Sequence, residues 1–328
     1  MPPPAASTPT GALQLANTTP AYPGPLPSPP PLEDMLIAAP RTARTPEPRP
    51  VPHEFRPAGL AEQAWRDAAA LPVGSLLAIS SADGGVGRST MVAALGSLLA
   101  LAVTAPVVAV DANPRPWGGM GERVGPGSGT VWDAVRELPR LTSRTEVERW
   151  TRRGPSGLLG LAGEVEVSRH RHPPTHHEAL AVAETLRTLY PLVLLDLMTA
   201  EIRGAWHALA AASAALLVAR ATSESIQHTL RLLAYQRSDR TPQAPAAPLL
   251  VVVSTSPRTS GDVRAVLRQA ATVAVGVHSI PYDPMLADAA PIDARHLAKA
   301  TRRALLELAA DVLHRCTTPL TGAIVGAS

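Results

Sequence analysis

The feature that most constrains the fold is a regular alternation of short apolar runs and helical patterns from residue 75 onward. Runs of about four to eight apolar residues without polar alternation are typical of strands that are buried on both faces. When helical segments separate such strands, a parallel sheet covered by helices is the expected arrangement. We therefore expect an α/β fold with a doubly wound, mostly parallel sheet.

The boundaries of these elements follow from the apolar runs and from the Gly and Pro residues between them. Strands are expected at residues 75–80, 106–110, 157–163, 192–197, 214–219, 249–255 and 273–280. Helices are expected at residues 58–71, 88–103, 130–138, 143–153, 177–189, 204–212, 223–237, 261–271 and 294–315.

The chain divides into a tail and one domain. Of its 35 prolines, 17 lie in the first 57 residues, where few large apolar side chains occur. Such a segment buries too little apolar surface to offset the entropy of ordering, so we expect residues 1–57 to be a disordered tail. Residues 27–32 (PSPPPL) could dock on an aromatic groove, or the tail is passive. Residues 58–316 form the expected domain, and residues 317–328 a flexible end.

Composition excludes several classes of protein. A net charge of +3 over 328 residues gives no argument for nucleic-acid binding. The single cysteine, Cys316, excludes an intramolecular disulfide and fits a reducing compartment. No apolar run reaches the ~20 residues of a membrane span, and the N-terminal sequence does not resemble a signal peptide. We expect a cytoplasmic protein.

The strongest motif is the sequence SSADGGVGRST at residues 80–90, between an apolar strand and a helix. Gly84, Gly85 and Gly87 allow backbone N–H groups to converge on a phosphate, and the helix N-terminus adds its positive end. Ser89 is placed to ligate Mg²⁺, and Thr90 to contact a phosphate. The alternative is an ordinary strand-to-helix turn that happens to contain glycines.

This loop resembles the deviant Walker A motif of MinD/ParA P-loop ATPases, and three further segments resemble the same family. Residues 108–114 (VAVDANP) are similar to the motif whose aspartate positions the attacking water, which here is Asp111. Residues 192–197 (LVLLDL) resemble the Walker B strand, with Asp196 near the metal. Residues 277–286 (VHSIPYDPML) resemble the segment that borders the nucleotide base.

The resemblance implies ATP and Mg²⁺ as cofactors. Nucleotide-binding residues would be Gly84, Gly85, Val86, Gly87, Arg88, Ser89, Thr90, Pro281 and Asp283. Ser89 and Asp196 would hold the metal, and Asp111 and Arg88 would act in hydrolysis. By the same resemblance, ATP would favour a homodimer and hydrolysis would release it.

Within that family, the chain is most similar to EspI-like proteins, which join a Pro-rich N-terminal segment to a MinD-like domain. The matching traits are the tail, the DANP motif, residues 155–158 (PSGL), residues 280–286 (IPYDPML) and the end of the last helix at residues 301–309. EspI-like proteins are associated with type VII secretion. The resemblance thus implies a protein partner in a secretion or positioning machine, and a location in the cytoplasm or at the inner face of the plasma membrane.

The sequence also departs from the family's pattern. Asp83 stands where the family has a lysine that reaches across the dimer, and a carboxylate facing a triphosphate would repel it. Arg88 replaces the second lysine; it keeps the charge but is bulkier. Lys299, on a late helix, is the only lysine of the chain. The pair Ser254 and Thr255 replaces the asparagine that recognises the purine.

Three functions therefore remain open. The first is an ATP-binding switch with slow or impaired hydrolysis that regulates or positions a larger assembly. The second is a pseudo-ATPase scaffold that does not hydrolyse ATP. The third is a ParA-type partitioning ATPase, which the small positive charge disfavours because it would bind DNA.

Other clusters have ordinary structural explanations beside functional ones. Residues 170–177 contain four histidines, which fit a metal site or a solvated loop. Trp117 and Trp132 flank a glycine-rich loop. These side chains could belong to a switch or partner-contact region, or they could pack in the core or at an interface. The arginines of the last helix could face anionic lipid or DNA, or could form a solvated face; these are Arg295, Arg302, Arg303 and Arg315.

Overall fold

The computed structural model describes residues 71, 74–103, 106–115, 118–166, 171–200, 203–238, 247–258, 261–274 and 276–317. The tail expected at residues 1–57, the helix expected at 58–71 apart from Leu71, and the flexible end expected at 317–328 apart from Thr317 lie outside these residues. Leu71 is not helical, and Thr317 is the last residue of a helix.

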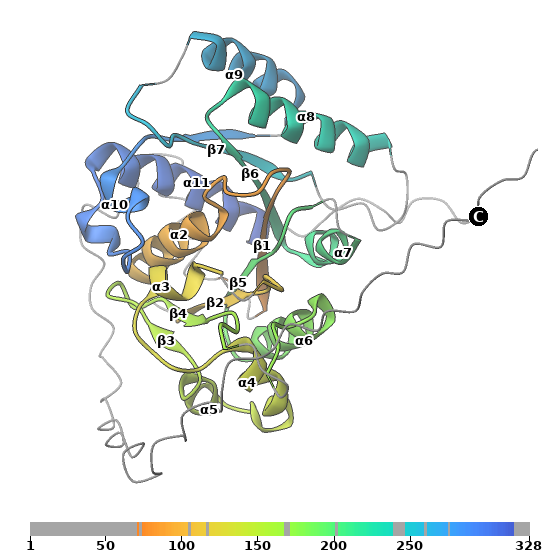
Figure 1. Cartoon of the computed structure of the whole chain (residues 1–328), viewed down its shortest axis with the longest axis vertical. Helices are drawn as coiled ribbons and strands as arrows, with labels where there is room; N and C mark the ends of the chain where they lie inside the picture. The colour runs from red at the N-terminus through yellow and green to blue at the C-terminus, as the bar shows by residue number, and fades with distance from the viewer. Residues whose placement is uncertain are drawn as a thin grey trace, which may run out of the picture. The chain divides into compact units, whose positions relative to one another are not determined.

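The described residues form an eight-stranded sheet with the order β3-β4-β2-β5-β1-β6-β7-β8 (Figure 1). Its strands are β1 (Ser75–Ser81), β2 (Val107–Asp111), β3 (Arg152–Arg153), β4 (Leu159–Leu161), β5 (Leu192–Asp196), β6 (Ala214–Arg220), β7 (Leu249–Val253) and β8 (Val277–Ile280). Every neighbouring pair is parallel except β3 and β4. The expected doubly wound, mostly parallel sheet is confirmed.

Helices connect the strands. The α-helices are α2 (Arg88–Ala102), α3 (Met120–Val124), α4 (Val131–Arg136), α5 (Arg144–Glu148), α6 (His176–Arg187), α7 (Arg203–Ala211), α8 (Ser223–Ser238), α9 (Gly261–Val273), α10 (Pro284–Ala287) and α11 (Lys299–Thr317). Two 3-10 helices are η3 (Leu138–Arg140) and η4 (Ala294–His296). Three helices begin with reciprocal capping boxes, which satisfy their first free N–H groups. The pairs are Thr130 with Asp133, Ser143 with Glu146 and Thr175 with Glu178.

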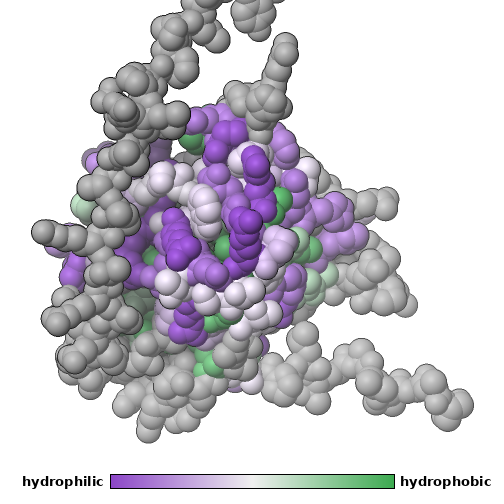
Figure 2. All heavy atoms as spheres, turned by 90° about the horizontal axis from the view of Figure 1, so that it is seen from below, coloured by the Kyte–Doolittle hydropathy of each residue, from purple (hydrophilic) through white to green (hydrophobic). Residues whose placement is uncertain are grey.

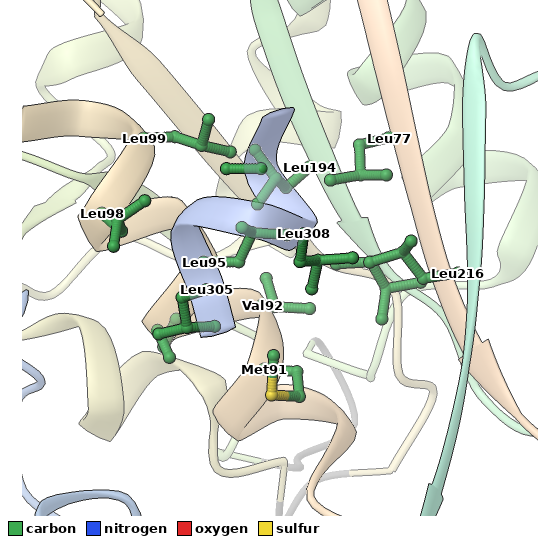
Figure 3. Close-up of a cluster of buried hydrophobic side chains, with 14 of the residues drawn as sticks. Leu77, Met91, Val92, Leu95, Leu98, Leu99, Leu194, Leu216, Leu305 and Leu308 are labelled. Atoms are coloured by element: carbon green, nitrogen blue, oxygen red, sulfur yellow. The ribbon is translucent and has the colours of Figure 1, made fainter. Parts of the chain in front are cut away.

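The two faces of the sheet have separate cores, because successive strand side chains point to opposite faces. Leu77 and Leu194 pack with α2 and α11 on one face (Figure 3). Leu76 and Leu195 pack with α4, α6 and α7 on the other. Helices α8 and α9 cover β6 and β7 on that second face. With both faces covered, the central strands are completely buried, as their apolar sequences predict.

The structure corrects three expected boundaries. The helix expected at 143–153 ends at Glu148, and Arg152–Arg153 pair with β4 as an antiparallel edge strand. The helix expected at 294–315 is interrupted, because Leu297 has an extended backbone that separates η4 from α11. The strand expected from residue 273 begins at Val277, since α9 continues to Val273. The short helices α3 and α10 were not expected.

The surface of the described residues is mainly polar. Among them, the large hydrophobic side chains that are strongly exposed are Val165 and Tyr235, at 57% and 63%. Figure 2 shows hydrophilic side chains over one face, with small separate hydrophobic areas between them. No helix in the described part of the chain is long and apolar enough to cross a membrane.

Candidate functional site

The glycine loop joins β1 to α2 at the centre of the sheet. Strand β1 lies between β5 and β6, so the loop leaves the C-terminal edge of the sheet at its middle. Gly85 and Gly87 have φ angles of 69° and 90°, a left-handed conformation that favours glycine. Helix α2 follows directly, with the Met91 N–H donating to the Gly87 carbonyl at 2.9 Å. Ligands of open α/β sheets bind at this edge.

A cavity of about 400 Å³ lies on this loop. That volume falls in the usual range for small-molecule sites. Its lining residues come from the loop, from the segments after β2 and β5, and from α3. They are Gly84, Gly85, Gly87, Arg88, Ser89, Thr90, Asn113, Arg115, Gly118, Gly119, Arg123, Met198 and Thr199. Six of the expected nucleotide-binding residues therefore line one cavity, whereas Val86 is buried beneath it.

The Arg88 guanidinium points toward the strand ends. Its Nε donates to Asp196 Oδ1 at 3.2 Å, and its Nη1 donates to Ser81 Oγ at 2.8 Å. The Arg88 side chain is 12% exposed and that of Asp196 is 0% exposed. Buried ion pairs are hard to break, because removing one partner leaves a buried charge without compensation. The positive charge at this motif position is thus engaged with the expected metal-binding carboxylate.

Asp111 and Asp196 end the neighbouring strands β2 and β5 in the same register. Both are fully buried, and each leaves its Oδ2 atom without a hydrogen-bond partner. Burial and the nearby Asp196 charge raise the pKa of Asp111 to about 7, against backbone N–H donation from Asn113 and Gly163. Burial also raises the pKa of Asp196, and Arg88 and the Ser89 hydroxyl partly offset that rise.

These groups fit a magnesium ion. Mg²⁺ prefers carboxylate and hydroxyl oxygens together with ligand phosphates. Ser89 and the unpartnered oxygen of Asp196 supply such atoms next to the glycine loop. Asp111 supplies a second unpartnered carboxylate oxygen behind them.

Two glycines enclose the Asp111 carboxylate. A Cβ atom at Gly118 would lie 2.8 Å from Asp111 Oδ2, and one at Gly163 would lie 3.0 Å from the same atom. Neither glycine has a positive φ, so glycine is favoured at these positions by the limited space and not by the backbone conformation. Any side chain at Gly118 would displace the carboxylate or the segment after β2.

Asp83 turns away from the cavity, contrary to the expectation that it faces the phosphates. Ser225 Oγ donates to its Oδ2 at 2.7 Å, and His228 Nδ1 lies 2.9 Å from its Oδ1. Both partners belong to α8. Beside them, Arg220 Nη2 donates to the Gly85 carbonyl at 3.0 Å. The first half of the loop is therefore fastened to β6 and α8.

Comparisons with known proteins show what this architecture is similar to. No protein-family model and no curated protein sequence matches the chain. Solved structures do match, three of them with TM-scores of 0.52 to 0.54. The ATP complex of McdA from Cyanothece has a TM-score of 0.54 at 17% identity, over 74% of this chain and 97% of that chain. The chain has the fold of ParA and MinD ATPases.

Two further structures support the same fold. A ParA family ATPase from Chlorobium tepidum has a TM-score of 0.52 at 15% identity, over 72% of this chain and 92% of that chain. The septum site-determining protein MinD of Pyrococcus horikoshii, complexed with Mg-ADP, has a TM-score of 0.52 at 18% identity, over 72% and 94%.

On this ParA/MinD-type fold, the segment expected to border the base does not line the cavity. Pro281 and Asp283 are not among the lining residues. Asp283 is buried, with its Oδ1 accepting from the Met285 N–H and its Oδ2 from the Ala298 N–H. It caps α10 and anchors the segment before α11. This contact set indicates a structural role for Asp283 in the conformation described.

The other clusters have structural partners. Among the described residues, no group of three or more His, Cys, Asp or Glu side chains could hold a metal ion. Arg171 pairs with Glu164 and Asp133 and stacks over the Trp132 ring at 4.5 Å. Arg136 lies over the same ring at 4.7 Å, which indicates packing for Trp132. His170 and Trp117 lie outside the described residues.

Sequence reasoning missed the two arginines that share the cavity with the glycine loop. Arg115 lies immediately after the DANP motif, and that position was the one signal that could have found it. Arg123 is on α3, which has only five residues and no apolar periodicity from which the helix could be predicted.

Proposed function

We propose that the chain is a nucleotide-binding switch protein that binds ATP and Mg²⁺ at the glycine loop. The observation that carries this proposal is the cavity on the glycine loop, together with the buried carboxylates Asp111 and Asp196, which end the neighbouring strands β2 and β5 in register. Two structures with a similar fold are complexes with ATP and with Mg-ADP, which supports the same ligand class here.

Each group has a definite task in this proposal. The loop N–H groups and Thr90 bind phosphate oxygens, and Ser89 and Asp196 hold the metal. Bound Mg²⁺ would neutralise phosphate charge. Asp111 would orient a water molecule beside the metal site. Since the Arg88 charge is engaged with Asp196, little of it is left to stabilise charge that develops during phosphoryl transfer. We therefore expect slow hydrolysis.

The wider role rests on sequence resemblance. We propose a homodimer that forms or dissociates with the bound nucleotide and that regulates or positions a partner assembly, such as a type VII secretion system. The EspI-like traits of the sequence support that partner class.

A pseudo-ATPase scaffold is the second candidate. The orientation of Arg88 and Asp83 favours it, because the side chains at both lysine positions contact protein groups. Phosphate release, measured over hours with ATP in excess over the protein, separates the two: release that exceeds one ATP per chain supports the switch, and binding without release supports the scaffold.

Gly84 offers a sharp test of nucleotide binding. A Cβ atom at Gly84 meets nothing within 4 Å, so the free protein should tolerate a side chain there. Gly84→Glu would place a negative charge at the cavity, whereas Gly84→Gln has the same size without the charge. Like charges at about 4 Å repel by up to ~4 kcal/mol at a dielectric near 20. We expect ATP affinity, measured by calorimetry with Mg²⁺, to fall at least tenfold more for Glu than for Gln.

The natural chain and both variants should be titrated with ATP and ADP, with Mg²⁺ and with EDTA. Equal affinities for the Glu and Gln variants would place the nucleotide elsewhere. Absence of binding by the natural chain would overturn the proposal.

A further inference from the structure

The cavity on the glycine loop contains three arginines, and they differ in what they contact. Two of them, Arg88 and Arg123, are engaged with protein groups, and the third, Arg115, is exposed. The difference matters because neither lysine position of the loop presents a free cation. A polyphosphate ligand there needs positive charge from another part of the chain.

Arg88 cannot supply that charge without breaking a buried pair. Its guanidinium holds Asp196 at 3.2 Å and Ser81 at 2.8 Å. Arg123 is tied in a different way. Its Nη1 donates to the Asp288 carbonyl at 2.5 Å, and burial lowers the pKa of its guanidinium. Its own carbonyl accepts from the Ile292 N–H at 2.8 Å. Arg123 thus links α3 to the segment after α10.

Arg115 is held by its backbone while its side chain stays exposed. The Asn113 N–H donates to Asp111 Oδ1 at 3.0 Å, and the Arg115 N–H donates to Asn113 Oδ1 at 3.2 Å. Two successive side-chain-to-backbone bonds therefore fix the turn that leaves β2. Within the described residues, no hydrogen bond or ion pair is found for the Arg115 guanidinium. It lines the same cavity as the glycine loop.

We infer that Arg115 is the cation that binds the terminal phosphate of a nucleoside triphosphate in this site. The inference rests on the proposed function and adds the residue that distinguishes a triphosphate from a diphosphate. Arg115 lies four residues after Asp111, which pairs in register with Asp196, the carboxylate proposed to hold the metal. We therefore place Arg115 at the end of the phosphate chain that the metal would share. Its planar group can bind two phosphate oxygens at once. In this chain, a cis arginine would replace the charge absent at Asp83.

The test compares Arg115→Ala and Arg115→Lys with the natural full chain. Arg303→Ala is the matched control, because Arg303 is 83% exposed on α11 and lines no part of the cavity. Calorimetric titrations with ATP, ADP, AMP and inorganic triphosphate give the affinities, and thermal melting without ligand checks the fold. We expect Arg115→Ala to weaken ATP and triphosphate binding by about 10- to 100-fold, which is the loss typical of a charge-assisted hydrogen bond. The affinity for ADP should fall less, and the affinity for AMP should stay unchanged. Arg115→Lys should recover part of the lost ATP affinity.

The outcomes separate this inference from the proposed function. If the natural chain binds ATP and Arg115→Ala binds it equally well, Arg115 has no phosphate role and the proposed function stands. If Arg115→Ala lowers the affinities for ATP, ADP and AMP by the same factor, Arg115 acts only through its general positive charge, and the inference is overturned. If the natural chain binds neither nucleotide nor triphosphate, both fail together.

Discussion

Two side-chain pairs fasten the glycine loop, and they differ in how far water reaches them. Arg88 and Asp196 are 12% and 0% exposed, and they lie beneath the loop at the ends of the central strands. His228 and Asp83 are 39% and 30% exposed, and they lie beside the loop on α8. Buried pairs are expensive to break, whereas exposed pairs contribute little. The loop is therefore held firmly on the strand side and loosely on the α8 side.

By the sequence resemblance, Arg88 and Asp83 correspond to the positions at which MinD/ParA ATPases are expected to have lysines. In this chain those positions contact the protein's own carboxylate, serine and histidine groups.

Removal of Arg88 should have the largest effect on stability. Arg88→Ala leaves the fully buried Asp196 without its counter-ion, which typically costs about 3 kcal/mol of unfolding free energy. Urea denaturation followed by circular dichroism measures the loss. Without Arg88, the already raised pKa of Asp196 should rise further, because its counter-ion is lost. The difference in unfolding free energy between the natural chain and Arg88→Ala should therefore be small near pH 4 and grow as the pH rises.

The double variant Arg88→Ala with Asp196→Asn is the control, because it removes the uncompensated charge. It should recover part of the lost stability. A double variant no more stable than Arg88→Ala would show that packing, and not charge, makes Arg88 important.

Asp111, on the strand side of the glycine loop, should make the free energy of unfolding depend on pH, with an effect of intermediate size. Its pKa is about 7 in the folded protein against 3.8 as the ordinary value. The folded state therefore binds the proton more tightly than the unfolded state. That contribution to stability is complete below pH 3.8 and is lost as the pH rises toward 7. Asp111→Asn should flatten this part of the stability profile and raise the free energy of unfolding at pH 8 by about 1–3 kcal/mol.

Denaturation between pH 4 and pH 8 checks this prediction. Asp133→Asn, which changes a partly exposed carboxylate outside the site, serves as the comparison. A natural chain whose stability stays flat across this range would contradict a raised pKa for Asp111.

Substitutions on the α8 side of the glycine loop should have the smallest effect on the free energy of unfolding. Asp83→Asn weakens one half-exposed ion pair, and we expect a loss of about 1 kcal/mol or less. Because Asp83 turns away from the cavity, ATP affinity should be unchanged, and Asp83→Lys should not increase it. Calorimetry with each variant tests this. A large gain in affinity for Asp83→Lys would mean that the side chain at this position reaches the ligand.

The central fold was predictable because its signals are local. Strands such as β5 are buried on both faces, so their sequences are continuous apolar runs with no competing pattern. The edge strand β3 consists of two arginines and forms only through pairing with β4, which no local pattern predicts. The break at Leu297 similarly depends on η4 and its cap at Asp293.

The cavity residues on the glycine loop were predictable from their spacing, but the directions of their side chains were not. Arg88 meets Asp196 across 108 positions of sequence, and Asp83 meets Ser225 and His228 across 142 and 145. Such contacts depend on the order of strands in the sheet. The sequence shows which charges are present, and only the fold shows which of them are neutralised.

The glycines around Asp111 have a consequence for how related sequences should be recognised. Gly118 and Gly163 lie 45 positions apart in numbering, and both approach the same carboxylate oxygen. A Cβ atom at Gly118 would force the carboxylate or the backbone to shift, and one at Gly163 would be a tight contact. A relative that keeps this buried aspartate in the same place should keep both glycines, even where its loop lysines have changed. The combination of Asp111 with two distant glycines is therefore a sequence marker of this site that does not depend on the Walker A pattern.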